Sequence, residues 1–180
     1  TGVQTCALPI FETLTKWLGT RNIIRVMPNT PCLVGQGASV WSKGPDVPEA
    51  AARATACLLA AVGTVHEAPE ALLDAVTGLS GSGPGFVALV VEALADGGVR
   101  AGLPRALALE LATATVAGTG ALIAATGEHP AVIRDRVASP GGTTIAGLAV
   151  LEQRGVRGAF IDAVAAAAER ARELGRPAGS

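Results

Sequence analysis

The chain has 180 residues, of which 49% are hydrophobic, and its 14 basic and 15 acidic side chains leave a net charge of −1. This length allows one domain or a small pair, and the apolar content is sufficient for a buried core. The balanced charge provides no basic surface for nucleic acid or for an anionic membrane, so the composition favours a small molecule or a protein as the partner.

The spacing of the three cysteines, Cys6, Cys32 and Cys57, matches neither a disulfide framework nor a zinc site. We therefore expect reduced thiols in a cytoplasmic protein and predict no metal site. No stretch has the basic start, apolar run and small-residue cleavage site of a secretory signal. The least polar stretch, Leu111 to Gly127, contains several threonine, alanine and glycine residues, and we interpret it as a buried helix rather than a membrane span.

Residues 1–10 do not fit the pattern that follows and resemble a translated sequencing adapter. We treat them as a non-native segment and leave them out of the fold prediction. We also expect the natural protein to continue upstream with residues other than these.

Residues 11–67 predict a small mixture of helices and strands. Apolar residues spaced three or four apart favour helices, and β-branched runs bounded by glycine or proline favour strands. The expected elements are a helix over 11–19, a strand over 22–27, a strand over 38–41, a helix over 48–62 and a strand over 64–66. This region is too small for a complete dinucleotide-binding domain. The sequence also lacks a strand followed by Gly-x-Gly-x-x-Gly, since the nearest run, Gly78 to Gly83, follows no convincing strand and has no lysine for phosphates.

After about Pro69 the sequence predicts helices only. Proline starts and glycine stops place them over residues 84–99, 104–126, 130–137, 143–153 and 159–174. The first two are apolar almost all round, because their large apolar residues cannot share one face. Only a large core or a partner subunit could cover such helices, so we expect an oligomer.

The turn from Ser139 to Thr144 runs directly into the apolar positions of the predicted helix over 143–153. Pro140, Gly141 and Gly142 allow a sharp turn and a close approach of the backbone to a ligand. We expect Thr143 or Thr144 to cap the helix, whose unpaired N–H groups and positive dipole end suit a small anion such as a carboxylate. An ordinary helix N-terminus is the alternative interpretation of the same residues.

Several long stretches occur in a recognisable order. They are Arg25 to Pro31, Asp74 to Pro84, Glu92 to Val99, Gly102 to Arg105 and Ile133 to Glu152. Together they resemble the pyrroline-5-carboxylate reductase family from about Phe11 to about Leu174. A mild departure is Gly85, where relatives usually have alanine.

The resemblance implies an α/β remnant of a Rossmann domain over residues 11–67, followed by an all-α dimerisation and substrate-binding domain over residues 68–176. The implied reaction is the reduction of 1-pyrroline-5-carboxylate to L-proline with NADPH or NADH, the final step of proline biosynthesis, in a homodimer or higher homo-oligomer. Because the family's nucleotide fingerprint is absent from this sequence, we expect a fragment with little activity by itself.

The resemblance also implies roles for residues of the turn. Thr144 is the expected catalytic residue, whose hydroxyl would orient the ring nitrogen and stabilise or relay its proton. Ser139 and the backbone of Gly141, Gly142 and Thr143 would hold the substrate carboxylate, together with Thr144 as a further contact.

Two residues outside the turn complete the expected site. Glu70 would contribute to the substrate site, with a capping carboxylate as the equally weighted alternative. Asn29 would lie at the carboxyl end of a Rossmann strand, near the nicotinamide end of the cofactor, unless it serves only as a turn residue between two prolines.

Two other functions remain open on the sequence. The first is a related imine or hydroxyacid reductase, although such enzymes typically use a helical lysine and the only lysines here, Lys16 and Lys43, lie outside the helical half. The second is a non-catalytic helical dimerisation module. Binding of proline at the Ser139–Thr144 turn would distinguish the reductase from such a module.

Overall fold

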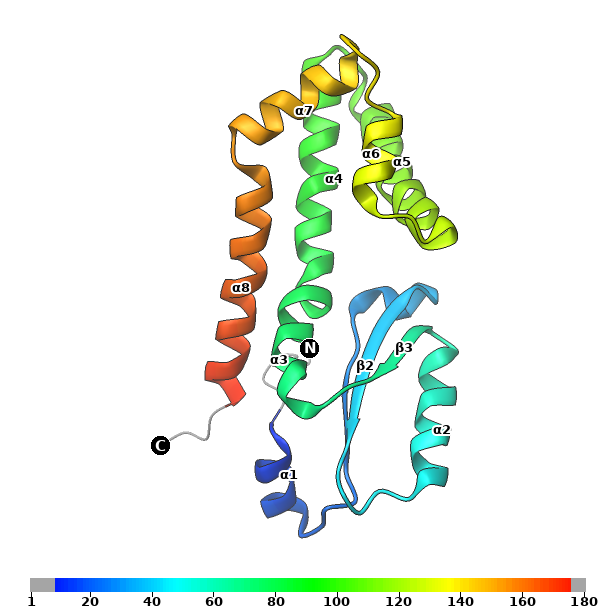
Figure 1. The fold of residues 1–180 in the computed structure, drawn as a ribbon, viewed down its shortest axis with the longest axis vertical. Helices are drawn as coiled ribbons and strands as arrows, with labels where there is room; N and C mark the ends of the chain where they lie inside the picture. The colour runs from blue at the N-terminus through cyan, green and yellow to red at the C-terminus, as the bar shows by residue number, and fades with distance from the viewer. Residues whose placement is uncertain (1–8, 176–180) are drawn as a thin grey trace. The chain divides into compact units, whose positions relative to one another are not determined.

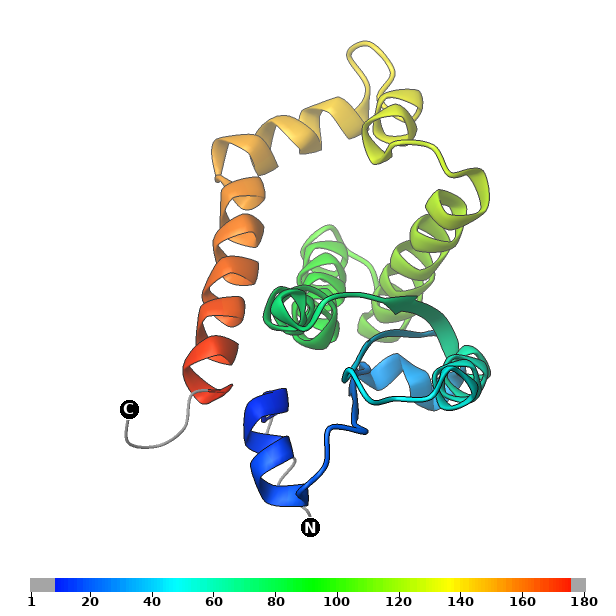
Figure 2. The ribbon, with the colours of Figure 1, turned by 60° about the horizontal axis from the view of Figure 1, so that its bottom comes forward.

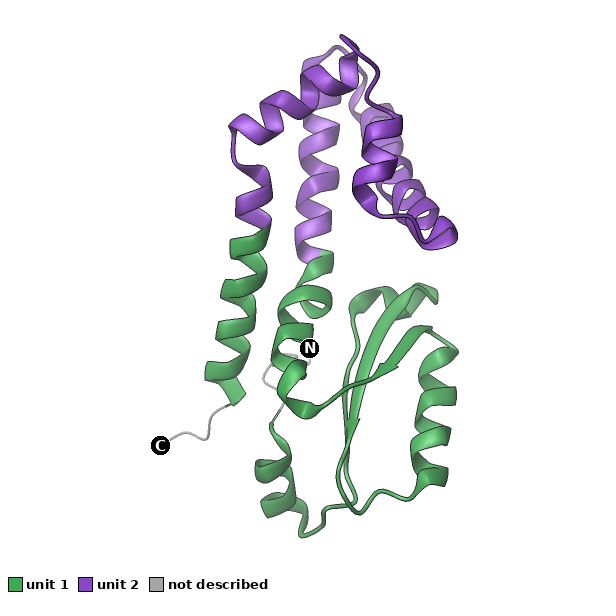
Figure 3. Ribbon diagram, viewed as in Figure 1, with its two compact units in different colours: residues 1–84, 161–180 green, residues 85–160 purple. Residues whose placement is uncertain are grey.

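The structure is a computed structural model that describes residues 9–175. It divides into two compact units, one formed by residues 1–84 and 161–180 and the other by residues 85–160 (Figure 3). The division passes through two long helices, so each unit is described by itself below. The predicted non-native segment lies largely outside the described residues, as does the end of the predicted helical domain at residue 176, and the predicted domain boundaries stay predictions.

The first unit contains a three-stranded sheet with the order β1-β2-β3. Strand β1 (Ile24–Met27) pairs antiparallel with β2 (Gly37–Lys43), and β2 pairs parallel with β3 (Gly63–Glu67). Helix α2 (Glu49–Ala60) connects β2 to β3 and packs beside β3 (Figure 2). Helix α1 (Phe11–Leu18) precedes the sheet, and Gly19 ends it in a left-handed conformation with φ of 65°. All five predicted elements of this region are therefore present.

The backbones of β2 and β3 lie unusually close together at the first residues of the two strands. The N–H of Gly37 donates to the carbonyl of Val62 at 2.8 Å. A Cβ on Gly63 would lie 2.0 Å from the carbonyl oxygen of Gly37, and Gly63 has a φ of 150° that other residues rarely adopt. Glycine is therefore required where the parallel pair begins.

A helical segment that the sequence analysis does not predict runs from Glu70 to Gly81. It consists of η2 (Glu70–Leu72), α3 (Leu73–Val76) and the π-helical turn η3 (Thr77–Gly81), and it leads into α4 (Gly83–Arg100) (Figure 1). Gly78, within this segment, has a packing role. A Cβ on Gly78 would lie 2.7 Å from the carbonyl oxygen of Val164 and 2.8 Å from the nitrogen of Ala168, both in α8 (Val156–Gly175). Gly78 thus allows two helices to pack backbone against backbone.

The second unit consists of helices joined by short turns. It contains the rest of α4, then α5 (Arg105–Thr126), α6 (Pro130–Arg136), α7 (Thr143–Gln153) and the start of α8. Its buried core is small, since Ala95 of α4 packs against Ala108 and Ala112 of α5. The five predicted helices of this half are all present, and α8 begins three residues earlier than expected, at Val156 rather than Ala159.

Large apolar side chains remain exposed along the helices of this chain. Leu89 and Leu94 of α4 are 63% and 49% exposed, and Leu122 of α5 is 49% exposed. The expectation that Leu111 to Gly127 forms a buried helix is therefore wrong for the single chain, in which Ala112 is the buried residue of that stretch. By length and composition alone, the helices over residues 70–100 and 105–126 could cross a membrane, a test that helices of soluble proteins also pass.

Candidate functional site

The turn between α6 and α7 closes on itself through one backbone hydrogen bond. The N–H of Gly142 donates to the carbonyl of Ser139 at 3.0 Å. Pro140 occupies the second position of this turn, and Gly141, with φ of 67°, occupies the third. This arrangement is typical of a type II turn, in which the third residue needs a positive φ. The sequence Pro-Gly-Gly therefore fixes the geometry of the chain where it enters α7.

The helix α7 begins without a side-chain cap, so the prediction that Thr143 or Thr144 caps it is wrong. Gly142 is the N-cap residue, in extended conformation with ψ of 176°, and no side chain of the described residues bonds the helix end there. Thr143 and Thr144 are instead the first two helical residues. The first helical bond runs from the N–H of Ala146 to the carbonyl of Gly142 at 3.3 Å.

The uncapped end provides donors for a ligand. Because the helical bonds start at Ala146, the N–H groups of Thr143, Thr144 and Ile145 point out of the N-terminus of α7. The helix dipole adds partial positive charge at the same place. Together these features form a site that suits a small anion.

Ser139 lies across this helix end. A Cβ added to Gly142 would lie 2.3 Å from the Ser139 hydroxyl oxygen and 3.1 Å from its carbonyl oxygen. Ser139 is exposed, whereas Thr144 is half-buried in the first turn of α7. Ser139, Gly141, Gly142, Thr143 and Thr144 thus lie in the turn and the first turn of α7, and their roles toward the substrate stay predictions.

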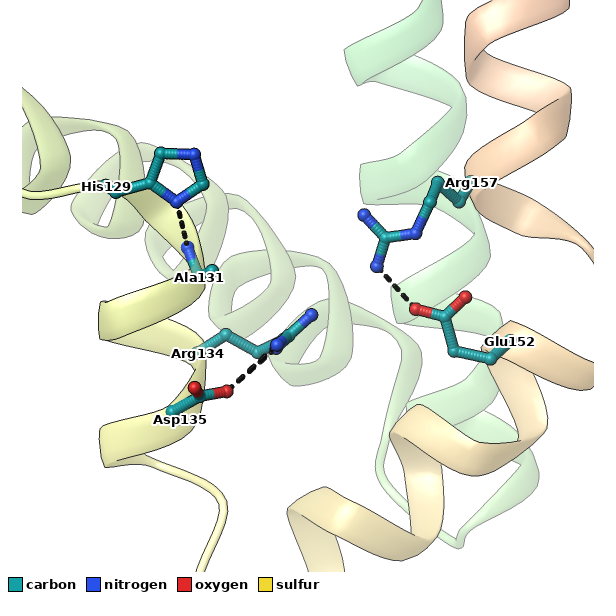
Figure 4. A network of polar contacts seen from close by, with 6 residues as sticks. All are labelled: His129, Ala131, Arg134, Asp135, Glu152 and Arg157. Carbon is teal, nitrogen blue, oxygen red and sulfur yellow. Dashed lines mark hydrogen bonds and ion pairs between the residues drawn. The ribbon is translucent and has the colours of Figure 1, made fainter.

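A side-chain cap and an ion pair stabilise the short helix α6 that leads into the turn. His129 accepts a hydrogen bond at Nδ1 from the N–H of Ala131 at 3.2 Å, which caps α6 (Figure 4). At the other end, the guanidinium of Arg136 donates to both carboxylate oxygens of Glu128 at 2.6 Å each. Arg136 therefore links the last turn of α6 to the residue before its cap, which keeps the helix in place ahead of the turn.

A further ion pair joins α7 to α8 after the turn. Arg157 donates to Glu152 at 2.5 Å, and Figure 4 shows the two side chains pointing toward each other. The hydrogen bond from Arg157 lowers the pKa of the Glu152 carboxyl, with the charge of Arg157 adding to the effect and that of Arg134 contributing less. The same hydrogen bond raises the pKa of Arg157.

Glu70 lies in the first unit, whereas the Ser139–Thr144 turn lies in the second. One carboxylate oxygen of Glu70 accepts hydrogen bonds from Nη1 of Arg25 at 2.7 Å and from the N–H of Phe11 at 2.6 Å. Glu70 therefore has protein partners within its own unit. Its role toward the substrate stays a prediction.

Asn29 follows the end of β1, as expected for the predicted cofactor-binding residue. Its side-chain oxygen accepts a hydrogen bond from the N–H of Ala38 at 2.8 Å, and it precedes the short 3-10 helix η1 (Thr30–Val34). The Asn29 side chain thus fastens this loop to the start of β2. Its contact with a cofactor stays a prediction.

Arg25 lies in the middle of β1 and was not predicted as a functional residue. Arg25 is only 5% exposed, although arginine is seldom buried unless it is paired. The available signal was a single charged residue inside the apolar run Ile23 to Met27. A buried arginine in such a strand predicts an acidic partner, which the structure identifies as Glu70.

Residues 70–174 match the family model described as "Pyrroline-5-carboxylate reductase dimerisation". The curated pyrroline-5-carboxylate reductase of Synechocystis is 60% identical over 155 residues, which cover 86% of this chain and 58% of that protein. The Arabidopsis thaliana enzyme of the same name is 54% identical over 161 residues, which cover 89% of this chain and 58% of that protein. The chain thus spans a little over half the length of these relatives.

Two solved structures share the fold. The pyrroline carboxylate reductase of Plasmodium falciparum, solved with NADP bound, is 33% identical with a TM-score of 0.87, over 93% of this chain and 68% of that chain. The pyrroline-5-carboxylate reductase of Coxiella burnetii is 35% identical with a TM-score of 0.87, over 92% and 62% of the two chains. These likenesses confirm the predicted fold class, a Rossmann remnant followed by a helical dimerisation domain. The chain belongs to the pyrroline-5-carboxylate reductase family.

Proposed function

We propose that the protein carrying this chain reduces 1-pyrroline-5-carboxylate to L-proline with NAD(P)H, the final step of proline biosynthesis. The observation that carries the proposal is the Ser139–Thr144 turn, whose open N–H groups stand at the start of α7. The turn lies inside the region that matches the family model, and relatives of 60% and 54% identity bear the name of this enzyme.

The substrate combines a carboxylate with a carbon–nitrogen double bond, and the turn offers a group for each. The N–H groups of Thr143, Thr144 and Ile145, together with the Ser139 hydroxyl, bind the carboxylate at the positive end of α7. The Thr144 hydroxyl, half-buried one residue into the helix, orients the ring nitrogen. A hydroxyl both donates and accepts, so Thr144 can hold the proton that the nitrogen carries during reduction. In this proposal no acid stronger than the Thr144 hydroxyl is needed at the nitrogen, because binding already orients the substrate for reduction.

A nicotinamide, when bound, supplies the hydride that reduces the ring carbon. The described residues fit such a cofactor at one point, since Asn29 follows the end of β1 and its side-chain NH₂ group can donate to a ligand. NADPH is the proposed cofactor, because the relative from Plasmodium falciparum was solved with NADP, and NADH is the alternative.

The proposed oligomeric state is a homodimer or a higher homo-oligomer, and the proposed location is the cytoplasm. Support comes from the exposed leucines of α4 and α5 and from the dimerisation region that the family model describes. Large exposed apolar surfaces mark sites of association. A partner subunit would bury these helix faces without a membrane.

Kinetics of Thr144→Ala test the proposal, in this chain joined to the nucleotide-binding part of a relative. A hydrogen bond to a charged group contributes about 1.5–3 kcal/mol, so kcat/KM for pyrroline-5-carboxylate should fall by about 10- to 100-fold. The matched control is Thr55→Ala, because Thr55 is another half-buried helical threonine, and it lies on α2 of the first unit, outside the proposed site and the proposed interface. A completed protein that folds yet shows equal kcat/KM for both variants would contradict the role of Thr144. A non-catalytic dimerisation module would show no turnover in any version.

A further inference from the structure

Glu70 joins three elements of the first unit through one carboxylate oxygen. That oxygen accepts from the N–H of Phe11, the first residue of α1, at 2.6 Å. It also accepts from Nη1 of Arg25 in β1 at 2.7 Å. Glu70 itself is the first residue of the helical segment that leads into α4. A single side chain therefore connects the start of α1, the middle of β1 and the start of the long helix.

The Arg25 side of this contact is buried. The Arg25 side chain is 5% exposed and that of Glu70 is 31% exposed. Every other ion pair of the described residues has at least one partner that is more exposed than Glu70, and most have two. Because a buried charge is costly without its partner, removal of Glu70 should affect folding more than removal of a surface carboxylate.

A second contact places the same face of β1 against the same helical segment. Arg25 and Met27 are two residues apart, so their side chains leave the strand on one side. Met27 reaches Gly81, since a Cβ on Gly81 would lie 2.4 Å from the terminal methyl group of Met27. The methyl group can move, so this contact shows proximity, whereas the ion pair at Arg25 supplies the constraint. The helical segment from Glu70 to Gly81 thus meets β1 at both of its ends.

The segment after Met27 carries Asn29. The backbone direction at Met27 therefore determines where the Asn29 loop begins, and the hydrogen bond from Ala38 to Asn29 fixes where it continues. A shift of β1 against the helical segment would move this loop.

We infer that Glu70 and Arg25 form a clamp that positions the Met27–Asn29 segment, and that Glu70 is a positioning residue rather than a ligand of the substrate. The inference opposes the expected substrate role of Glu70. It rests on the proposed function only where the cofactor is concerned, because the clamp itself consists of contacts within the first unit. Both short donors bond Oε1, one of the two carboxylate oxygens, and a substrate contact with this carboxylate would compete with the charge of Arg25.

A double-mutant cycle on thermal unfolding tests the clamp without reference to activity. The proteins are the completed enzyme and its Glu70→Gln, Arg25→Met and doubly substituted variants. Each single change should lower the Tm by about 5 °C or more, and the double change should cost little more than Arg25→Met, because each removes the same interaction. The matched control is Arg21→Met, since Arg21 pairs with Asp46 at 3.6 Å with both side chains more than half exposed. Its Tm should change by about 1 °C or less. Additive losses in the cycle would overturn the clamp.

Steady-state kinetics of the same variants separate positioning from substrate binding. For a clamp, Glu70→Gln and Arg25→Met should both raise the KM for NADPH by at least about threefold and leave the KM for pyrroline-5-carboxylate nearly unchanged. For a substrate ligand, Glu70→Gln alone would raise the KM for pyrroline-5-carboxylate, and Arg25→Met would not. That second pattern would overturn the inference. If the enzyme reduced no pyrroline-5-carboxylate at all, the proposed function would be wrong. The double-mutant cycle on thermal unfolding would still test the clamp, because it does not depend on activity.

Discussion

Gly141 and Gly142 shape the turn by different means, although they are neighbours. Gly141 needs its positive φ of 67° but has open space around its Cβ position. Gly142 has ordinary extended dihedral angles, but a Cβ there would collide with Ser139. One glycine is therefore required by backbone conformation and the other by the closeness of a side chain that takes part in the proposed site.

This difference gives a prediction for Gly141→Ala. A left-handed conformation costs an L-residue roughly 1–2 kcal/mol, so the free energy of unfolding should fall by about that amount. The matched control is Gly158→Ala in α8, which also meets open space but has no positive φ. An alanine there should stabilise the helix by about 0.5–1 kcal/mol. Chemical denaturation of the three proteins measures the difference, and an equal effect of both substitutions would contradict the assigned backbone geometry.

The turn at Ser139–Thr144 was predictable from the sequence at the level of its residues, but the way it meets α7 was not. Pro140 and the two glycines indicated a sharp turn before a helix, and the structure has one there. The sequence alone does not identify the N-cap residue, because both glycine and threonine are common at that position and Gly142, Thr143 and Thr144 are consecutive. The ion pair between Arg25 and Glu70 could not be predicted from local sequence patterns, since its partners are 45 positions apart in the sequence.

At the scale of single elements, Gly78 determines how the first helical segment packs. The three atoms nearest to its Cβ position are the carbonyl oxygen of Val164, the nitrogen of Ala168 and the Cβ of Ala168, at 2.7, 2.8 and 2.9 Å. Two of the three belong to backbone, which cannot rotate away. The segment over Glu70–Gly81 and α8 can approach this closely only because position 78 lacks a side chain.

Gly78→Ala should therefore push the two helices apart. We expect the free energy of unfolding to fall by about 1–3 kcal/mol, the usual cost of overpacking a fitted contact. Gly97→Ala is the control, because Gly97 lies in α4 with open space around its Cβ position and should gain stability from better helix propensity. Thermal unfolding measures both, and a stabilising Gly78→Ala would show that the helices are not in backbone contact.

The same glycine explains why this segment escaped prediction. Helices such as α5 and α7 carry long apolar patterns with a proline or glycine at their ends, and the sequence predicts them within a few residues. Between Glu70 and Gly83 the glycines at 78, 81 and 83 are typical of a loop by propensity. Tertiary packing outweighs propensity there, and the π-helical turn over Thr77–Gly81 adds an irregularity that no periodic pattern contains.

At the scale of the whole molecule, the exposed apolar faces of the helical unit are typical of a surface that associates with another subunit. A groove of about 760 Å³ runs along α4 and α5. Its lining includes the apolar residues Ala88, Leu89, Val91 and Leu109 and the charged residues Glu92 and Arg105. Leu89 is 63% exposed. The sequence predicted such an uncovered surface, because α4 and α5 are apolar on several sides, but only the structure shows how little of it the chain covers by itself.

A charge in this groove should therefore prevent association. For Leu89→Lys we expect a shift from dimer to monomer in sedimentation velocity, because desolvating an ammonium group among these apolar side chains is costly even with Glu92 in the same groove. Leu58→Lys is the control, since Leu58 is 74% exposed on α2 of the first unit and should leave the oligomer unchanged. Dissociation by the control alone would place the interface on the sheet-containing unit instead.

The most direct test of the account is the stoichiometry of the proposed reaction. This chain, joined to the nucleotide-binding part of the Plasmodium falciparum relative that was solved with NADP, would be given pyrroline-5-carboxylate and NADPH, with proline and oxidised cofactor both quantified. We expect one proline for each NADPH oxidised. We also expect very little turnover by the 180 residues alone, because their sequence contains no Gly-x-Gly-x-x-Gly run. A completed, folded and dimeric protein that forms no proline, but reduces another imine or a hydroxyacid precursor, would contradict this account.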